Sequence, residues 1–142
     1  MRIKVLKSVL KIDESGITES SAEIQKQVRE YERGNRQTFE LNVHRPNSVL
    51  GDVMGAMAEI PYGETRTYGT LAAELGTAPV AVGQACGRNP VPLIIPCHRV
   101  VGSDGGLKGY SGGDGIPTKR RLLEFEASNS GAGSVQSRLP TG

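Results

Sequence analysis

The chain has 142 residues, a net charge of +2 and 37% hydrophobic residues, so it supports one domain with at most a small extra module and an aliphatic core. No apolar run reaches the roughly 18 residues of a membrane-spanning helix, and the start lacks a signal-peptide core, so we expect neither a membrane nor a secreted protein. Two cysteines and two histidines are too few for a disulfide framework or an ordinary zinc site, so we expect a reduced, cytoplasmic protein without metal or cofactor.

The first part of the chain predicts a small module of strands and one helix. Hydrophobic and polar residues alternate at its start and again near its end, as in half-buried strands, and between them Ile24, Val28 and Tyr31 repeat at helical spacing. The expected elements of this module, residues 1–43, are one or two strands within 2–12 broken near Ser8, a helix from Ser20 or Ser21 to about Arg33, and a strand over 38–43, followed by a linker at 44–47.

The next part predicts a helical unit. Ser48 suits the N-cap of a helix with one apolar stripe. Two short helices follow, the first from Thr67 to Gly76 and the second over 80–86, after Pro79. This is the arrangement of a helix-turn-helix, although helical hairpins of this length are also common in proteins that do not bind DNA.

The rest of the unit predicts one more helix among irregular segments. Apolar residues between prolines over 89–101 predict a buried extended segment, and a glycine-rich loop follows at 102–115. A last helix is expected over about 117–125, and the Ser/Gly-rich segment 127–142 is expected to be a disordered tail. Positive charges exceed negative ones by four within 79–121, which by charge alone favours a solvated surface over a phosphate-binding one.

Cys97 and His98 are the candidate reactive pair. Only the thiolate of a cysteine is a strong nucleophile, and an imidazole within reach, directly or through water, takes the thiol proton. Neighbouring residues point apart on a regular strand, so the two side chains need a turn or a bridging water to cooperate. The alternative is an inert buried cysteine beside a surface histidine. Cys86 has no histidine or carboxylate nearby in the sequence and is interpreted as a packing or pocket-lining residue.

Several motifs of this second part resemble those of one known family, the methylated-DNA–protein-cysteine methyltransferases, which repair O6-alkylguanine. The likeness extends from about Ser48 to Glu126. The resemblance implies an α+β fold, in which a small strand-and-helix N-terminal module precedes a mainly helical catalytic domain at 48–126 with a winged-helix-like helix-turn-helix. The motifs that carry it are Ile60-Pro61-Tyr62-Gly63-Glu64-Thr65-Arg66-Thr67-Tyr68-Gly69, Arg88-Asn89-Pro90, Ile95-Pro96-Cys97-His98-Arg99-Val100 and Gly109-Tyr110-Ser111-Gly112-Gly113.

The resemblance also implies a role for individual residues. Cys97 is the expected alkyl acceptor, His98 the base that ionises it through a water, and Glu126 the carboxylate that orients His98. Asn89 is expected to hold the turn around the active site, and Tyr68 to rotate the target nucleotide outward. The expected base pocket is formed by Tyr110, Ser111, Cys86 and the backbone carbonyls of Cys97 and Val100. The expected DNA contacts are Tyr68, Val80, Ala81, Gln84, Arg88 and Arg99.

The partner implied by the resemblance is double-stranded DNA that contains O6-alkylguanine. The helix over 80–86 is expected to enter the minor groove, where its small side chains fit, and the target base must leave the stacked duplex. The product is a thioether, so one molecule repairs one lesion. We expect a monomer without a cofactor that works in the cytoplasm at the nucleoid, or in the nucleus of a eukaryote.

The sequence departs from the family pattern in two places. Val80 stands where the family carries an arginine that fills the gap left by the extruded base. An apolar side chain fills space but forms no hydrogen bond with the orphaned cytosine, so we expect slower capture of lesions in duplex DNA. The N-terminal module, residues 1–43, is shorter than in the family and is expected to brace the catalytic domain.

Two other functions stay open at this point. A DNA-binding protein that senses the lesion without repairing it gains weight from Val80, but relatives of that kind replace the acceptor cysteine, which this chain keeps as Cys97. A thiol hydrolase would need an oxyanion site, which the sequence does not reveal. Turnover would identify a hydrolase, whereas a stable adduct would identify alkyl transfer.

Overall fold

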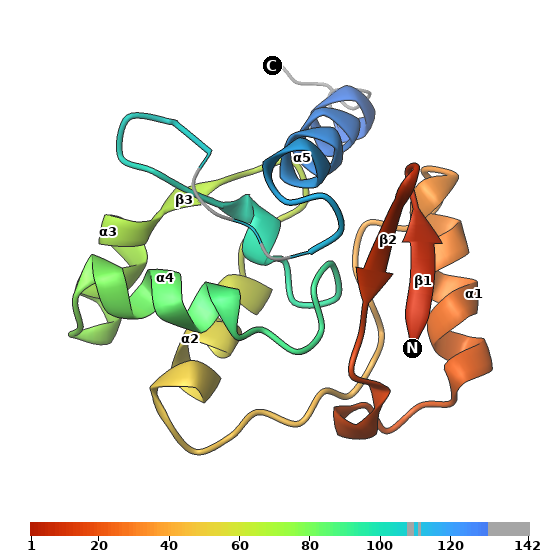
Figure 1. The fold of residues 1–142 in the computed structure, drawn as a ribbon, viewed down its shortest axis with the longest axis horizontal. Helices are drawn as coiled ribbons and strands as arrows, with labels where there is room; N and C mark the ends of the chain where they lie inside the picture. Colours follow the sequence, from red (N-terminus) through yellow and green to blue (C-terminus); the bar gives the residue numbers. More distant parts are fainter. Residues whose placement is uncertain (108–109, 111, 131–142) are drawn as a thin grey trace.

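A computed structural model describes residues 1–107, 110 and 112–130 of the chain. A β-hairpin and one helix, α1, form the N-terminal module, which lies beside a mainly helical second part (Figure 1). The α+β fold expected from the sequence is therefore confirmed. Within the described residues, no helix combines the length and the hydrophobicity that crossing a bilayer requires.

The hairpin pairs β1 (Arg2–Val5) with β2 (Ser8–Lys11) in antiparallel register. Leu6 and Lys7 form the turn and have φ angles of 48° and 71°, the left-handed conformation that matches the twist of a two-residue hairpin. The strand break thus lies at Leu6 and Lys7, just before Ser8. The carboxylate of Glu32, at the end of α1, accepts a hydrogen bond from the amide of Leu6 at 3.0 Å and ties the turn to the helix.

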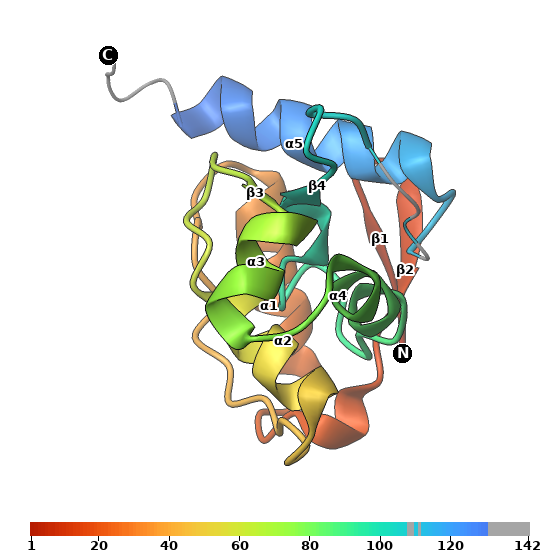
Figure 2. The same cartoon turned by 90° about the vertical axis from the view of Figure 1, so that its left-hand side faces the viewer.

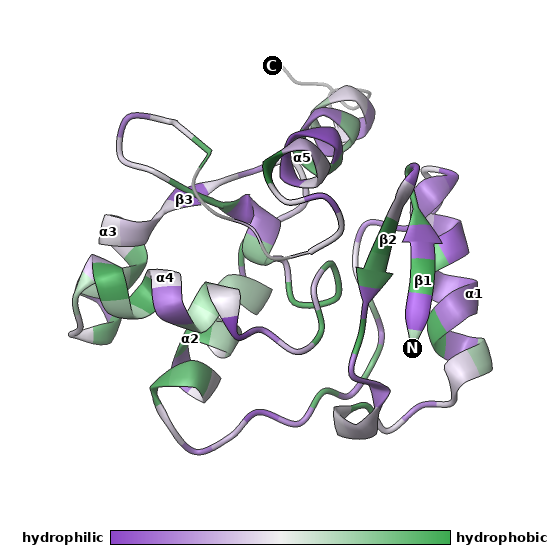
Figure 3. Cartoon of the chain, in the orientation of Figure 1, coloured by the Kyte–Doolittle hydropathy of each residue, from purple (hydrophilic) through white to green (hydrophobic). Residues whose placement is uncertain are grey.

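Helix α1 (Ser21–Glu32) begins as the sequence predicts. The hydroxyl of Ser20 caps it by accepting a hydrogen bond from the amide of Glu23 at 3.2 Å. One stripe of the helix is buried against the hairpin, whereas the rest of α1 is mostly hydrophilic (Figure 3). The buried stripe consists of Ile24, Gln27, Val28 and Tyr31.

The strand expected over 38–43 does not form. Only Val43 makes a bridge, with Ile17. The side chain of Gln27 instead bonds both backbone groups of Glu40, accepting from its amide at 2.9 Å and donating to its carbonyl at 3.2 Å. The side chain of Gln27 thus forms the hydrogen bonds with Glu40 that a neighbouring strand would otherwise form. The backbone of this segment is therefore hydrogen-bonded without a sheet.

The second part is built on three packed helices, which are α2 (Val49–Ala58), α3 (Tyr68–Leu75) and α4 (Pro79–Gly87) (Figure 2). Thr67 caps α3 through its hydroxyl, and Gly76 ends it with a left-handed φ of 66°. Helices α3 and α4 form the helix-turn-helix that the sequence predicts. Ser48 precedes α2 but makes no side-chain capping bond.

The segment after α4 is buried from residue 91 onward, as expected, although Pro90 is only half-buried. It leads into a short 3₁₀ turn, η2 (Cys97–Arg99), and then into β4 (Val100–Val101), which pairs in parallel with β3 (Arg66–Thr67). Every residue from 91 to 102 is buried. The reactive motif is therefore delivered by a turn in the interior and not by a strand at the surface.

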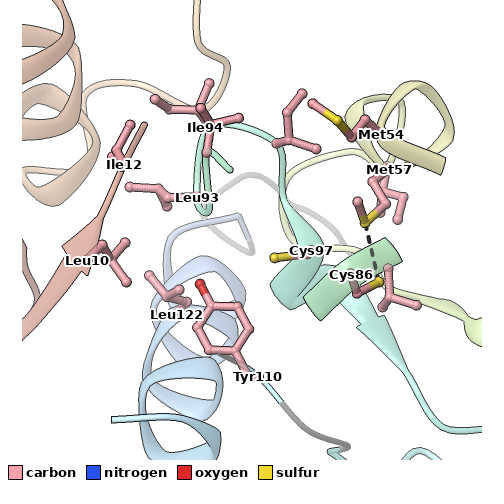
Figure 4. Close-up of a cluster of buried hydrophobic side chains, with 14 of the residues drawn as sticks. Leu10, Ile12, Met54, Met57, Cys86, Leu93, Ile94, Cys97, Tyr110 and Leu122 are labelled. Atoms are coloured by element: carbon pink, nitrogen blue, oxygen red, sulfur yellow. Dashed lines mark hydrogen bonds between the residues drawn. The ribbon is translucent and has the colours of Figure 1, made fainter. Parts of the chain in front are cut away.

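Helix α5 (Ile116–Ser130) packs against both parts of the molecule (Figure 2). It extends to Ser130, so residues 127–130, expected in the disordered tail, are helical; residues 131–142 lie outside the described part. The hydroxyls of Ser8 and Thr118 share a hydrogen bond of 2.8 Å. One hydrophobic cluster joins the parts of the molecule and contains Leu10 of the hairpin, Leu122 of α5, and Leu93 from the buried segment after α4 (Figure 4).

Candidate active site

Cys97 lies at the start of the η2 turn and is buried. Cys86 of α4 and Tyr110, from the loop before α5, lie in the same cluster of side chains (Figure 4). Burial raises the pKa of the Cys97 thiol, while a hydrogen bond with Asn89 and the charge of Lys119 act in the opposite direction. The thiol is therefore protonated at rest at neutral pH, and its use as a nucleophile requires a base.

His98 is poised to be that base. Its Nε2 atom lies 2.8 Å from Oε2 of Glu126, and both side chains are shielded from solvent. Burial lowers the pKa of His98, so the ring is neutral at pH 7. A neutral imidazole that donates Nε2–H to a carboxylate keeps a lone pair on Nδ1. Among the described residues, Nδ1 is buried and has no hydrogen-bond partner, so it is available to accept a proton.

Glu126 is held in its charged form. Burial alone raises the pKa of its carboxyl group, but the hydrogen bonds from His98 and Arg99, together with the charge of Arg99, outweigh burial and lower that pKa to about 2. Arg99 donates from Nε to Oε1 at 2.8 Å and from Nη2 to Oε2 at 3.0 Å. This two-pronged contact gives the carboxylate a compensating charge inside the protein.

The predicted DNA contact of Arg99 is corrected by the structure. The guanidinium is buried, and its remaining Nη1 group donates to the carbonyl of Ile60 at 2.7 Å. It also lies over the ring of Tyr62, 5.7 Å from the centroid. Arg99 is therefore an internal counter-ion of Glu126, because an ionised carboxylate in the interior needs a paired charge.

Tyr31 joins this site from the N-terminal module. Its hydroxyl donates to Oε2 of Glu126 at 2.7 Å, the oxygen that also contacts His98. Burial raises the pKa of Tyr31, so the hydroxyl stays protonated and remains a donor. The sequence identified Tyr31 as part of an apolar helix stripe, and no local pattern linked it to a carboxylate 95 positions away.

Lys119 is a second residue that sequence reasoning missed. It lies on α5 and is fully buried, with Nζ 3.3 Å from the hydroxyl of Tyr68 and 5.6 Å from the centroid of that ring. Burial raises the pKa of Cys97 and of Cys86, and the charge of Lys119 offsets part of that rise. The spacing along the sequence could have indicated the burial of Lys119, because Lys119 and Glu126 are two helical turns apart and therefore lie on one face of α5.

Asn89 connects the two ends of the buried segment. Its Nδ2 group donates to the carbonyl of Ile95 at 2.8 Å, and its Oδ1 atom accepts from the amide of Val91 at 3.1 Å. Together with its hydrogen bond to Cys97, these contacts place Asn89 where it fixes the loop that presents the thiol.

The residues expected in the base pocket lie around Cys97 where the structure describes them. Tyr110 is buried, and its hydroxyl has no hydrogen-bond partner among the described residues. Cys86 is buried as well and donates from Sγ to Sδ of Met57 at 3.5 Å. Val100 lies in the buried strand β4. Ser111 lies outside the described residues.

The expected DNA-contacting residues of α4 share one face. Val80 is 68% exposed, Gln84 and Arg88 are exposed, and Ala81 is half-buried. The opposite face, with Val82, Ala85 and Cys86, packs inward. Tyr68 begins α3 and is half-buried against Lys119. The structure thus combines a slim, exposed helix face with a buried thiol, a neutral imidazole and a charged carboxylate.

Comparisons with known proteins converge on one family. Residues 49–128 match the family described as 6-O-methylguanine DNA methyltransferase, DNA binding domain. A methylated-DNA–protein-cysteine methyltransferase of Methanosarcina barkeri is 44% identical over 110 residues, which cover 75% of this chain and 68% of that protein. The chain spans about two thirds of the length of its curated relatives.

Solved structures agree with this result. Mycobacterium tuberculosis OGT in complex with DNA superposes with a TM-score of 0.71 and 42% identity, covering 77% of this chain and 68% of that one. S. pombe Atl1, in complex with damaged DNA containing O6-carboxymethylguanine, gives a TM-score of 0.50 and 30% identity over 58% of this chain and 79% of that one.

Proposed function

Since this chain belongs to the 6-O-methylguanine DNA methyltransferase family, we propose that it repairs O6-alkylguanine in DNA by transferring the alkyl group to its own Cys97. The observation that carries the proposal is the triad of a buried thiol, a neutral His98 with a vacant Nδ1 lone pair, and an ionised Glu126 on Nε2. Such a triad activates a nucleophile without metal or cofactor.

The reaction follows from these protonation states. His98 takes the thiol proton through a water, and the thiolate of Cys97 attacks the alkyl carbon in line with the carbon–O6 bond. A carbon–sulfur bond forms, the carbon–oxygen bond breaks, and the bonding electrons leave with guanine O6. The guanine takes up a proton as the imidazolium returns to its neutral form. Glu126 stabilises that imidazolium while it exists.

The protein is consumed by this reaction. A thioether is stable to hydrolysis, because water does not displace a thiolate from an unactivated alkyl carbon. One molecule therefore repairs one lesion. Catalytic turnover of a thiol hydrolase type would contradict the proposal.

DNA binding is assigned to the exposed face of α4. Its small side chains suit a narrow minor groove, and the exposed Arg88 at the end of α4 is free to contact a phosphate. Tyr68 turns the nucleotide outward, and the base enters the space beside Tyr110, Cys86 and the carbonyl of Val100. The protein acts as a monomer on chromosomal DNA, in the cytoplasm at the nucleoid or in a eukaryotic nucleus.

Lesion sensing without transfer is the second candidate function. The likeness to S. pombe Atl1 and the exposed Val80 on α4 favour it. Cys97, His98 and Glu126 in one connected site favour repair instead, because a protein that only senses the lesion has no use for a nucleophile and its base.

Mass spectrometry distinguishes these functions. The protein is incubated with a duplex that carries one O6-methylguanine, and the intact mass and peptide masses are measured. Repair predicts a gain of one CH₂ unit mapped to the peptide that contains Cys97 and not to the peptide that contains Cys86, and Cys97→Ser is the variant that loses the gain. A gain from free O6-benzylguanine alone would indicate working chemistry with impaired base extrusion. No gain from either substrate would support the sensing function.

A further inference from the structure

We propose that Tyr31 of the N-terminal module is a positioning residue for alkyl transfer, because its hydroxyl fixes the Glu126 oxygen that contacts His98. The inference rests on the proposed function and goes beyond the bracing expected of this module. It assigns the module a defined part in the chemistry of Cys97.

The geometry around Glu126 leaves its carboxylate no freedom to turn. The Oε2 atom receives three donors, namely Tyr31 Oη at 2.7 Å, His98 Nε2 at 2.8 Å and Arg99 Nη2 at 3.0 Å. Oε1 receives Arg99 Nε at 2.8 Å. Without the Tyr31 hydroxyl, the oxygen that orients His98 is held only by His98 itself and by one prong of Arg99.

The ring of Tyr31 is itself held in place. It is fully buried, stacks on Phe39 at a centroid distance of 5.8 Å, and contacts Tyr62 edge-on at 6.1 Å. Phe125, next to Glu126 on α5, lies at 5.4 Å. The hydroxyl is thus aimed by a rigid aromatic cluster, and a donor in a fixed place orients its acceptor.

The same hydrogen bond moderates the basicity of His98. Three donors share the charge of Oε2, and each reduces the negative charge that the imidazole experiences. Removing the hydroxyl leaves more of that charge facing His98, which favours the imidazolium and raises the pKa of His98. The other titratable groups near this pair are Arg99, Lys119, Cys97, Tyr62 and Tyr110, and the substitution leaves all of them in place.

The test compares Tyr31→Phe with Tyr62→Phe. Each variant removes one buried hydroxyl from the same aromatic cluster, but the hydroxyl of Tyr62 has no hydrogen-bond partner among the described residues. The single-turnover rate of alkyl transfer from free O6-benzylguanine is measured from pH 5 to pH 9, since the free base removes any contribution of DNA binding.

For Tyr31→Phe we expect the maximum of the pH–rate profile to be roughly tenfold lower. We also expect the acid limb of that profile, where the rate rises as His98 loses its proton, to move to higher pH by about half a unit. Tyr62→Phe is expected to keep the wild-type limb. A destabilised but correctly positioned site loses amplitude without moving the limb. An unmoved limb in Tyr31→Phe, or an equal displacement in Tyr62→Phe, would overturn the inference.

A spectroscopic measurement separates this inference from the proposed function. The chain has two histidines, His44 and His98, so ¹⁵N-labelled protein gives two resolvable imidazole patterns that report tautomer and titration. We expect Tyr31→Phe to raise the titration midpoint of His98 alone. If the wild type transfers no alkyl group, the proposed function fails while this result still stands; if His98 titrates unchanged, the role of Tyr31 fails whatever the activity.

Discussion

Glu126 carries a full negative charge in a part of the protein from which solvent is excluded, and three residues hold it there. Each of them has a different role. Arg99 provides the compensating positive charge, the hydroxyl of Tyr31 fixes the position of the carboxylate, and His98 is oriented by that carboxylate. Such a network is worth most when it is complete, because a single missing member leaves a buried group without a partner.

We expect Glu126→Gln to lower the free energy of unfolding at pH 7 by about 3–5 kcal/mol, because the guanidinium of Arg99 is left buried without its counter-ion. Urea unfolding measures this change. Glu124→Gln, two positions away on the exposed side of α5, is the matched control and should stay within about 0.5 kcal/mol of the wild type. Equal losses in the two variants would show that the buried pair contributes no stability.

The pH dependence of stability has a defined sign. The pKa of Glu126 is about 2 in the folded protein against 4.5 for the free side chain. Its carboxylate therefore stabilises the fold fully above pH 4.5, and this contribution, about 3 kcal/mol, is lost as the pH falls towards 2. The stability difference between wild type and Glu126→Gln should shrink through that window in acid titrations followed by circular dichroism; a constant difference would contradict the assignment.

Lys119 is expected to tune the thiol. Its charge lowers the pKa of Cys97, so Lys119→Met should raise that pKa and displace the alkylation of Cys97 by iodoacetamide to higher pH. Peptide mapping separates Cys97 from Cys86. Arg120→Met, at the exposed neighbouring position, is the control, and a displacement of the same size there would assign the effect to net charge rather than to Lys119.

At the scale of elements, α4 combines two requirements on its two faces. Val82, Ala85 and Cys86 pack inward beside the site, while Val80 and Gln84 face outward. The outer face is slim enough for a narrow groove, but it offers an apolar side chain where the family places an arginine. If α4 enters the minor groove as proposed, we expect its shape to suit the groove but its apolar Val80 to replace the extruded base poorly.

We expect Val80→Arg to raise the rate of methyl transfer from duplex DNA about tenfold, because a cation in the minor groove gains phosphate attraction and can pair with the orphaned base. The rate with free O6-benzylguanine should not change, since Val80 is 68% exposed, whereas the thiol of Cys97 is buried. Single-turnover rates on both substrates measure this. An unchanged duplex rate would mean that Val80 does not limit base extrusion.

At the scale of the whole molecule, the two parts share their interior. Leu10 of the hairpin, Leu93 and Leu122 lie in one hydrophobic cluster, and the amide of Asp13 donates to the carbonyl of Pro90 at 2.8 Å. The N-terminal module is therefore built into the same core as the site, and the protein should unfold as one unit.

Leu10→Ala tests this unity. The side chain is fully buried, so we expect a loss of about 2–5 kcal/mol, with coincident urea transitions for tyrosine fluorescence and for helical circular dichroism. Val9→Ala removes a neighbouring exposed side chain and should change stability by less than about 0.5 kcal/mol. Two separate transitions in Leu10→Ala would show that the module unfolds independently.

The sequence predicted the features that depend on neighbouring residues alone, above all the ends of the helices. Ser20, Thr67, Gly76 and Pro79 act at helix ends, where one residue type satisfies or ends the backbone ladder by itself. The order of the motifs likewise indicated the family and the reactive Cys97.

What the sequence could not predict depends on distant partners. In the sequence, Arg99 and Lys119 look like ordinary surface charges, because their partners Glu126 and Tyr68 are far away along the chain. The backbone of Glu40 is bonded by a side chain of α1 and not by a strand. The contact of Tyr31 joins residues 95 positions apart, and no periodic pattern encodes such a pair.

Four residues on one face of helix α5 make four separate contacts. Thr118 contacts the hairpin, and Lys119 contacts Tyr68. Leu122 packs into the shared interior, and Glu126 belongs to the site. Inserting or deleting a single residue between Thr118 and Glu126 would rotate one end of that face by about 100° relative to the other. Over evolutionary time this stretch can accept new outward side chains but no change in length, whereas length changes beyond Glu126 leave all four contacts in register.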